Sequence, residues 1–302
     1  MDQIQTGWAH FDRIGDNIPA SDPELFLPLE AVIRAQAEQR YLVSKFNVSP
    51  LIGGVAPHGD TTPIKNATIN QIAYHDCMGG LMVSTRNSEI NSRNIDTSIS
   101  AWVTGDTVAQ EVARRVTDKY TLDASAENYD KLVFIPGSNI FNTVDWNKVS
   151  EILIDHPTAM IKAHPVTTPA GMDWLNAQYA GRVIASSVKG VALLSTASMV
   201  WTTYNSEIGM ICAVRRIPFG NLTQWHSAGS VTYSPIYRHF KYKDLDHNYA
   251  VMSAVLESPI SGFVFPWQGD WEQRIESYFA GLTRFKSGLA YPYMEGNSEA
   301  PI

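Results

Sequence analysis

The sequence is poor in cysteine, and the two cysteines that it has do not form a metal-binding pattern. Cys77 and Cys212 lie far apart among the 302 residues, and no further ligand stands at a diagnostic spacing from either. A disulfide between them is left open, but a chain of this length can bury a sufficient core without one. Because sparse cysteine without a pattern is typical of reducing compartments, we expect a cytoplasmic protein.

Long apolar runs and an excess of basic residues are also absent. No run approaches the roughly 20 apolar residues that a membrane-spanning helix needs. Residues 1–8 lack the basic segment and apolar core of a signal peptide. The chain has 23 Lys and Arg against 30 Asp and Glu, a net charge of −7. We therefore expect no membrane partner and no bulk attraction to nucleic acid, although a local basic groove is compatible with this charge.

Several motifs of nucleotide-binding and hydrolytic enzymes are missing as well. The sequence has no phosphate-binding P-loop and no Gly-x-Gly-x-x-Gly. The turn at residues 136–139 is not a nucleophile elbow, because Ile140 stands where that motif ends in glycine. The Asp-x-Asp at Asp244 and Asp246 has the form of a metal site, but it precedes an apolar-periodic stretch instead of following a strand. We interpret it as a helix cap and predict no bound metal.

What the sequence does contain is an alternation of short apolar runs and helical patterns over residues 131–220. The apolar runs are at residues 131–135, 158–163, 182–187 and 199–203. Short β-rich runs that alternate with helical segments are typical of βαβ units. This stretch therefore predicts a parallel sheet flanked by helices.

The rest of the chain also has α/β character, with a less regular rhythm and a polar linker candidate at residues 118–130. The sequence predicts the following elements there: a helix at about 29–39, a strand at 41–48, a turn-rich loop at 49–63, a strand at 79–85, an Asn- and Ser-rich loop up to residue 98, a helix that begins after Asp106 as its N-cap, a helix at 246–257 and a last amphipathic helix at 271–286.

Polar turn residues stand where the predicted strands of the regular stretch end. The first strand is followed by Ser138 and Asn139, the second by a His-Pro pair at His164, and the last by Asn205 and Ser206. Ligands of parallel sheets bind beyond the carboxyl ends of the strands. A histidine there can donate a charge-assisted hydrogen bond to a phosphate. Each turn alone has an ordinary explanation as turn or cap, but their recurrence at three strand ends indicates phosphate binding.

The position and order of these motifs resemble the nucleotide-binding domain of GT-B glycosyltransferases. The closest likeness is to bacterial enzymes with an HP motif and a later Ser/Thr motif, such as capsule Kdo transferases and sialyl- and polysialyltransferases. The likeness covers about residues 131–220, under a third of the chain. It implies contacts from His164, and from Ser206 with Thr203 as its neighbour, to the donor nucleotide. With the other strand-end residues, the predicted donor-binding set is Ser138, Asn139, His164, Thr203, Asn205, Ser206 and Glu207.

The resemblance also implies an architecture of two Rossmann-like domains with parallel sheets and a C-terminal helix that crosses back. We expect an acceptor-side α/β domain at residues 1–125 and a nucleotide-sugar-binding domain at residues 126–270. The C-terminal helix, within residues 271–302, is expected to pack on the first domain.

The reaction implied is transfer of a sugar from a nucleotide-activated donor to an acceptor hydroxyl, without metal or cofactor. The general base is expected in the N-terminal half, where Asp60, His58 and Asp106 lie in predicted loops. Asp60 as a turn residue and Asp106 as a cap are structural alternatives. Compact enzymes of this style in bacteriophages glycosylate hydroxymethylated pyrimidines in DNA, so modified DNA is one expected acceptor and a capsular polysaccharide is another. A nucleotide-sugar epimerase and a non-catalytic nucleotide-sugar-binding protein remain alternatives.

Overall fold

The computed structural model describes part of the chain: residues 49–52, 71–85, 88–101, 105–118, 123–124, 127–204, 206–223, 233–265, 267–271, 273–274 and 277–278. The predicted helix at 29–39 and strand at 41–48 lie outside these residues. No helix among the described residues is both long and apolar enough to cross a bilayer.

Within the described residues, five parallel strands form the sheet predicted for the regular stretch. They are β4 (Lys131–Phe134), β5 (Met160–Lys162), β6 (Val183–Ile184), β7 (Met199–Thr202) and β8 (Phe219–Asn221). Their order across the sheet is β6-β5-β4-β7-β8. If the strands are numbered along the chain, this is the 3-2-1-4-5 order of the Rossmann fold. The α/β prediction is confirmed, with the strands shorter than the apolar runs.

Helices cover both faces of this parallel sheet. They are η2 (Ser138–Thr143), α5 (Trp146–Asp155), α6 (Pro169–Gln178), α7 (Gly190–Leu193) and α8 (Ile208–Val214). Alternate strand residues point to opposite faces. Val133 and Ile161 pack with α5 and α6, whereas Leu132 and Val200 pack with α7 and α8. The sheet is therefore the middle layer of an α/β/α sandwich.

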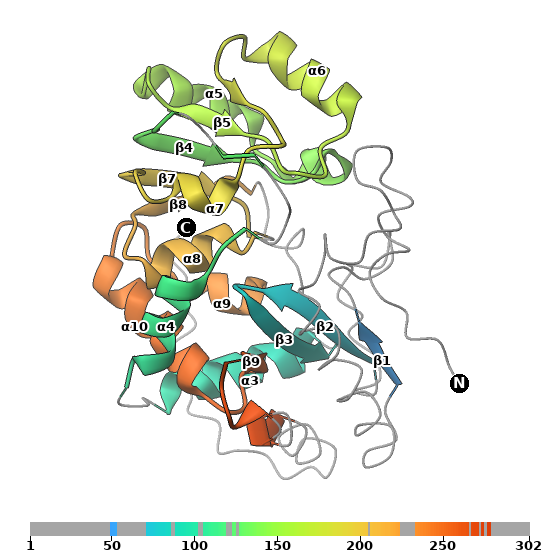
Figure 1. Cartoon of the computed structure of the whole chain (residues 1–302), viewed down its shortest axis with the longest axis vertical. Coiled ribbons are helices and arrows are strands. Elements are labelled where there is room, and N and C mark those ends of the chain that lie inside the picture. The colour runs from blue at the N-terminus through green and yellow to red at the C-terminus, as the bar shows by residue number, and fades with distance from the viewer. Residues whose placement is uncertain are drawn as a thin grey trace.

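A second sheet is built from β1 (Ser49–Ile52), β2 (Gln71–Cys77), β3 (Gly80–Thr85) and β9 (Phe263–Val264), in the order β1-β2-β3-β9. The first pair is parallel and the other two pairs are antiparallel. The expectation of parallel sheets thus holds for the larger sheet, while this one is mixed. Figure 1 shows it below the parallel sheet, with α8 between the two.

Two loop predictions for the N-terminal half are wrong in the parts that the structure describes. The loop expected from residue 49 begins as β1, an edge strand, and an edge strand tolerates Pro50 because its missing N–H need not pair. The Asn- and Ser-rich loop is largely α3 (Ser88–Ser100). Its buried face includes Asn94 and Ser98, and Ser98 Oγ donates to Ser258 Oγ at 2.8 Å. A helix whose buried face is largely polar, with Ile95 as an exception, shows too weak an apolar periodicity to reveal it.

The remaining helices pack between and beside the sheets: α4 (Thr107–Arg115), α9 (Ser234–Tyr237) and α10 (Leu245–Glu257). The predicted α10 is confirmed within one residue. Asp106 does occupy the N-cap position of α4, but its side chain makes no capping hydrogen bond. The carboxylate of Glu257 in α10 accepts from Val108 N at 2.7 Å instead. The expected cap is thus supplied by a residue that is distant in sequence.

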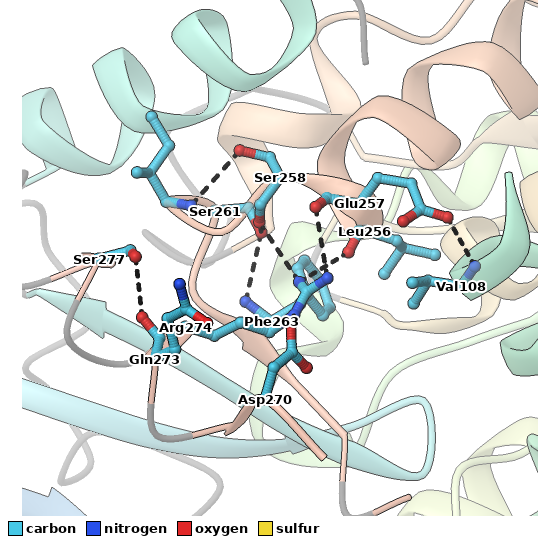
Figure 2. Close-up of polar contacts among 11 residues, drawn as sticks. Val108, Leu256, Glu257, Ser258, Ser261, Phe263, Asp270, Gln273, Arg274 and Ser277 are labelled. Carbon is cyan, nitrogen blue, oxygen red and sulfur yellow. Dashed lines mark hydrogen bonds and ion pairs between the residues drawn. The ribbon is translucent and has the colours of Figure 1, made fainter. Parts of the chain in front are cut away.

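A buried arginine joins the C-terminal helical segment to the end of α10. Figure 2 shows Arg274 donating to the backbone oxygens at the end of α10, at 3.0 Å to Leu256 and 3.3 Å to Glu257. A cation at a helix C-terminus is favoured by the helix dipole. Tyr278, from the same segment, donates through its hydroxyl to Asn91 of α3 at 3.4 Å. The segment therefore contacts both α10 and α3.

Candidate functional site

The parallel sheet has a topological switch point between β4 and β7. From β4 the chain builds outward to β5 and β6, and it then returns to the other side of β4 to form β7 and β8. Loops after the two central strands leave toward opposite faces, which opens a crevice at their carboxyl ends. The predicted polar turns follow β4, β5 and β7, so the structure brings them to this edge. We call this set of turns the strand-end rim: residues 135–138, 163–168 and 203–207.

The first two turns of the rim are joined by hydrogen bonds. Ser138 Oγ accepts from Thr168 N at 3.0 Å and donates to Thr168 Oγ1 at 3.1 Å. Thr168 Oγ1 also accepts from Gly171 N and so caps α6. At Gly171 a Cβ would lie 2.8 Å from Ser138 Cβ, so the close approach needs glycine. The Ser138 hydroxyl therefore fixes the rim, and the structure describes only the backbone of Asn139.

His164 lies in a tight turn directly after β5. Its backbone oxygen accepts from Thr167 N at 2.9 Å, and its Nδ1 accepts from Val166 N at 3.2 Å. Because Nδ1 is an acceptor, the proton of the neutral ring is on Nε2. The ring is half-buried. Nε2 is therefore the ring nitrogen that acts as a hydrogen-bond donor.

The third turn holds Thr203 and Ser206, while Asn205 lies outside the described residues. Thr203 is buried, and its backbone oxygen accepts from Ser206 N at 3.1 Å. Ser206 Oγ accepts from Ile208 N at 3.2 Å, at the start of α8. That bond uses an oxygen lone pair and leaves the hydroxyl proton to donate elsewhere.

Glu207 connects the rim to the other sheet. Its carboxylate accepts from Met78 N at 3.1 Å, in the turn between β2 and β3. Met78 is a buried residue with a φ of 57°, so the turn is held in a left-handed conformation that few side chains adopt. This contact places the tip of the β2–β3 hairpin next to the third turn.

The spacing of these turns can be estimated from the sheet itself. Neighbouring strands lie about 4.8 Å apart, and β4 separates β5 from β7. The ends of β5 and β7 are therefore roughly 10 Å apart. His164 follows the end of β5 and Ser206 follows the end of β7, so both lie at this edge of the sheet, on either side of β4.

A buried lysine at the same edge was not predicted from the sequence. Lys162 ends β5 and is 2% exposed, and its Nζ donates to the backbone oxygens of Ala163 and Ser186. Burial lowers the pKa of Lys162 to about 8, and the charge of Asp118 partly opposes this. The only signal in the sequence was a lysine inside the apolar run 158–163.

Of the three predicted general bases, Asp106 alone falls within the described residues. Asp60 and His58 lie outside them. Asp106 accepts from the Tyr249 hydroxyl at 2.9 Å, and Arg216 stacks on that Tyr249 ring just beyond the C-terminus of α8. Ser206 precedes the other end of α8, so the structure separates the two. Hydrogen bonds from Gln110 and Tyr249 lower the pKa of Asp106, whereas a general base at neutral pH needs a raised one.

The described residues hold no group of three or more His, Cys, Asp or Glu side chains that could bind a metal ion. Asp244, from the Asp-x-Asp, accepts from His247 N at 3.1 Å and caps α10, which confirms that interpretation. Cys77 and Cys212 are both buried thiols, and burial raises the pKa of Cys212 well above its ordinary value. The rim is thus held by hydroxyls, one imidazole, the Glu207 carboxylate and backbone groups.

Comparison with known proteins gives little further guidance. No protein-family model matches the chain, and no curated protein matches it in sequence. Among solved structures, it is similar to one from Listeria monocytogenes described as a UDP-N-acetylglucosamine 2-epimerase, with 12% identity and a TM-score of 0.30. The match covers 65% of this chain and 54% of that one, so it spans about half of the neighbour. A match this weak assigns no function.

Proposed function

We propose that this protein is a glycosyltransferase that moves a sugar from a nucleotide-activated donor to an acceptor hydroxyl. The observation that carries the proposal is the arrangement of the strand-end rim around the switch point. His164 and Ser206 follow strands on either side of β4, at the edge where Rossmann-like sheets bind nucleotides. The same two residues carry the resemblance to the HP and Ser/Thr motifs of GT-B enzymes.

The chemistry proposed for the rim is stabilisation of the leaving nucleotide. Breaking the bond between sugar and phosphate leaves negative charge on the phosphate. Nε2–H of His164 and the hydroxyl of Ser206 would donate to its oxygens, which is electrostatic stabilisation of the transition state. The acceptor hydroxyl loses its proton to a general base, for which Asp60 and His58 stay the proposed residues.

The donor site is tested by thermal shift with UDP, GDP, CMP and TDP and their sugars, because a ligand that binds the folded state raises the melting temperature. We expect one nucleotide class to stabilise the wild type. His164→Ala should weaken that binding by about 10-fold or more, since a hydrogen bond to a charged group contributes roughly 1.5–3 kcal/mol. His247→Ala is the control, because its imidazole bonds the backbone oxygen of His239, outside the rim.

No stabilisation by any nucleotide, or equal binding by wild type and His164→Ala, would refute the donor site. Turnover then separates the reaction classes. A transferase releases nucleotide when an acceptor is added, an epimerase converts the donor alone, and a binding protein does neither. Duplex DNA with hydroxymethylated pyrimidines and an oligosaccharide acceptor are the two acceptor arms. The DNA is proposed first and the polysaccharide is the alternative.

A further inference from the structure

Tyr237 reaches the strand-end rim from outside the βαβ units. It is the last residue of α9 and is 4% exposed. Its hydroxyl donates to the backbone oxygen of Ser206 at 2.7 Å. A partly buried carbonyl that loses a hydrogen-bond donor carries a desolvation cost, so this bond restrains the backbone of Ser206.

The position of that hydroxyl is fixed by its surroundings. The Tyr237 ring packs against Tyr204 and Phe240, with centroids 5.3 Å away in both cases, and edge-on against Phe219. On the α8 side, a Cβ added to Gly209 would lie 2.1 Å from the Tyr237 oxygen. A tyrosine held on several sides cannot move its hydroxyl without repacking these neighbours.

Other contacts hold the same turn and the same helix. Tyr204 N donates to Thr223 Oγ1 at 3.0 Å, which restrains the start of the turn. On the far side of Tyr237, both Arg238 and His239 bind the carboxylate of Asp96 in α3, the latter at 2.8 Å. The C-terminal end of the short α9 is thus held both to the rim, through Tyr237, and to α3, through the two residues that follow it.

We propose that Tyr237 is a positioning residue of the candidate site, which holds the turn of Ser206 so that its hydroxyl points to the ligand. The ligand part of this inference rests on the function proposed above. The restraint on the turn does not, and it can be measured in the protein without ligand. The contact of Tyr237 with Ser206 is made to the backbone oxygen, so Tyr237 would act through that residue and not on the reacting atoms.

The matched pair of variants is Tyr237→Phe and Tyr278→Phe. Both tyrosines are buried and both lose one hydroxyl hydrogen bond, but that of Tyr278 goes to Asn91 in α3. In the protein without ligand, hydrogen exchange at residues 206–208 should accelerate by roughly 3- to 10-fold in Tyr237→Phe, the range expected for one hydrogen bond. It should be unchanged there in Tyr278→Phe. With the nucleotide that stabilises the wild type, the dissociation constant should rise over the same range only in Tyr237→Phe.

Gly209→Ala is the second variant, because it keeps the hydroxyl and displaces it. It should accelerate exchange and weaken binding in the same way. Unchanged exchange at residues 206–208 in both site variants would overturn the restraint. Accelerated exchange with wild-type nucleotide affinity would overturn the positioning role. If the wild type binds no nucleotide, the proposed function fails, while the exchange result still decides whether Tyr237 holds the turn.

Discussion

The two sheets of this protein are assembled over different distances along the chain. In the parallel sheet, β4 pairs with β5 and β7, and all five strands lie between Lys131 and Asn221. In the mixed sheet, Leu81 of β3 pairs with Val264 of β9. The mixed sheet is therefore complete only when β9, far along the chain, has paired with β3. A regular, local sheet carries the rim, and a sheet closed by a distant strand supports it.

The core shows how these two regions are coupled. One face of the parallel sheet has its own cluster with α5 and α6, but the other face shares a cluster with β2, β3 and β9. Helix α8 lies inside the shared cluster, and Gly209 to Val214 are all buried. A helix that is buried all round serves as common core for both regions. The turn before α8 carries Ser206 and Glu207, so this part of the rim is attached to the helix that both sheets share as core.

The dependence of the mixed sheet on β9 can be tested at Gly262, which precedes that strand. Its φ is +90°, and a Cβ there would lie 2.1 Å from the backbone oxygen of Val83. Gly262→Ala should lower the free energy of unfolding by roughly 3–4 kcal/mol, because the substitution adds backbone strain and a clash with backbone that cannot relax. Urea unfolding followed by circular dichroism measures the loss. The substitution should also make the amides of the β3–β9 pairing exchange faster than those of the parallel sheet.

Gly79→Ala is the control for that substitution. Gly79 also has a positive φ, of +78°, but a Cβ there meets nothing within 4 Å. Gly79→Ala should lower the free energy of unfolding through backbone strain alone, by about 1–2 kcal/mol. Equal losses at the two glycines would mean that β9 does not pack against the mixed sheet as tightly as its geometry indicates.

The sequence was informative where the determining interactions are local. The apolar runs and polar turns of residues 131–220 predicted four of the five strands of the parallel sheet and the place of His164 and Ser206, whereas β8 lies outside the predicted runs. By contrast, β9 is two residues long, and only its pairing with β3 makes it a strand. The polar buried face of α3 and the cap of α4 by Glu257 also depend on distant partners. Tyr237 and Lys162 were missed for the same reason, since their roles depend on what packs against them.

The buried Lys162 of the parallel sheet makes the stability of the protein sensitive to pH. The Asp118 carboxylate, which follows α4, accepts from Val191 N at 2.8 Å at the start of α7, and its charge opposes the fall of the Lys162 pKa. Burial lowers that pKa from 10.5 to about 8. Between these values the unfolded chain binds more protons than the folded one, so stability rises with pH. Below pH 8 the folded protein bears the full cost of a buried ammonium.

Lys162→Met should remove this dependence while keeping the side chain long and apolar. Since one pKa unit is worth about 1.4 kcal/mol, the wild type should gain roughly 2 kcal/mol relative to the variant between pH 8 and 9.5. Urea unfolding of both proteins at pH 7.5, 8.5 and 9.5 gives the difference, in which all other titrating groups cancel. A difference that stays constant, or that falls with pH, would contradict a buried charged lysine.

The smallest losses of stability are expected from removing helix caps. They should be the same in both regions, because helix caps act locally. Asp145 caps α5 beside the parallel sheet, and Asp244 caps α10 beside the mixed sheet. In each case the carboxylate accepts from a backbone N–H three residues on, at 3.1 Å. Asp145→Ala and Asp244→Ala should each cost about 1 kcal/mol, and the Asn variants should cost less because Asn also caps. Added Mg²⁺ or Mn²⁺ should leave both losses unchanged. A clearly larger loss at Asp244, or one that depends on the metal, would show that its Asp-x-Asp does more than begin a helix. It would also show that the contribution of even a local motif depends on the residues that surround it in the fold.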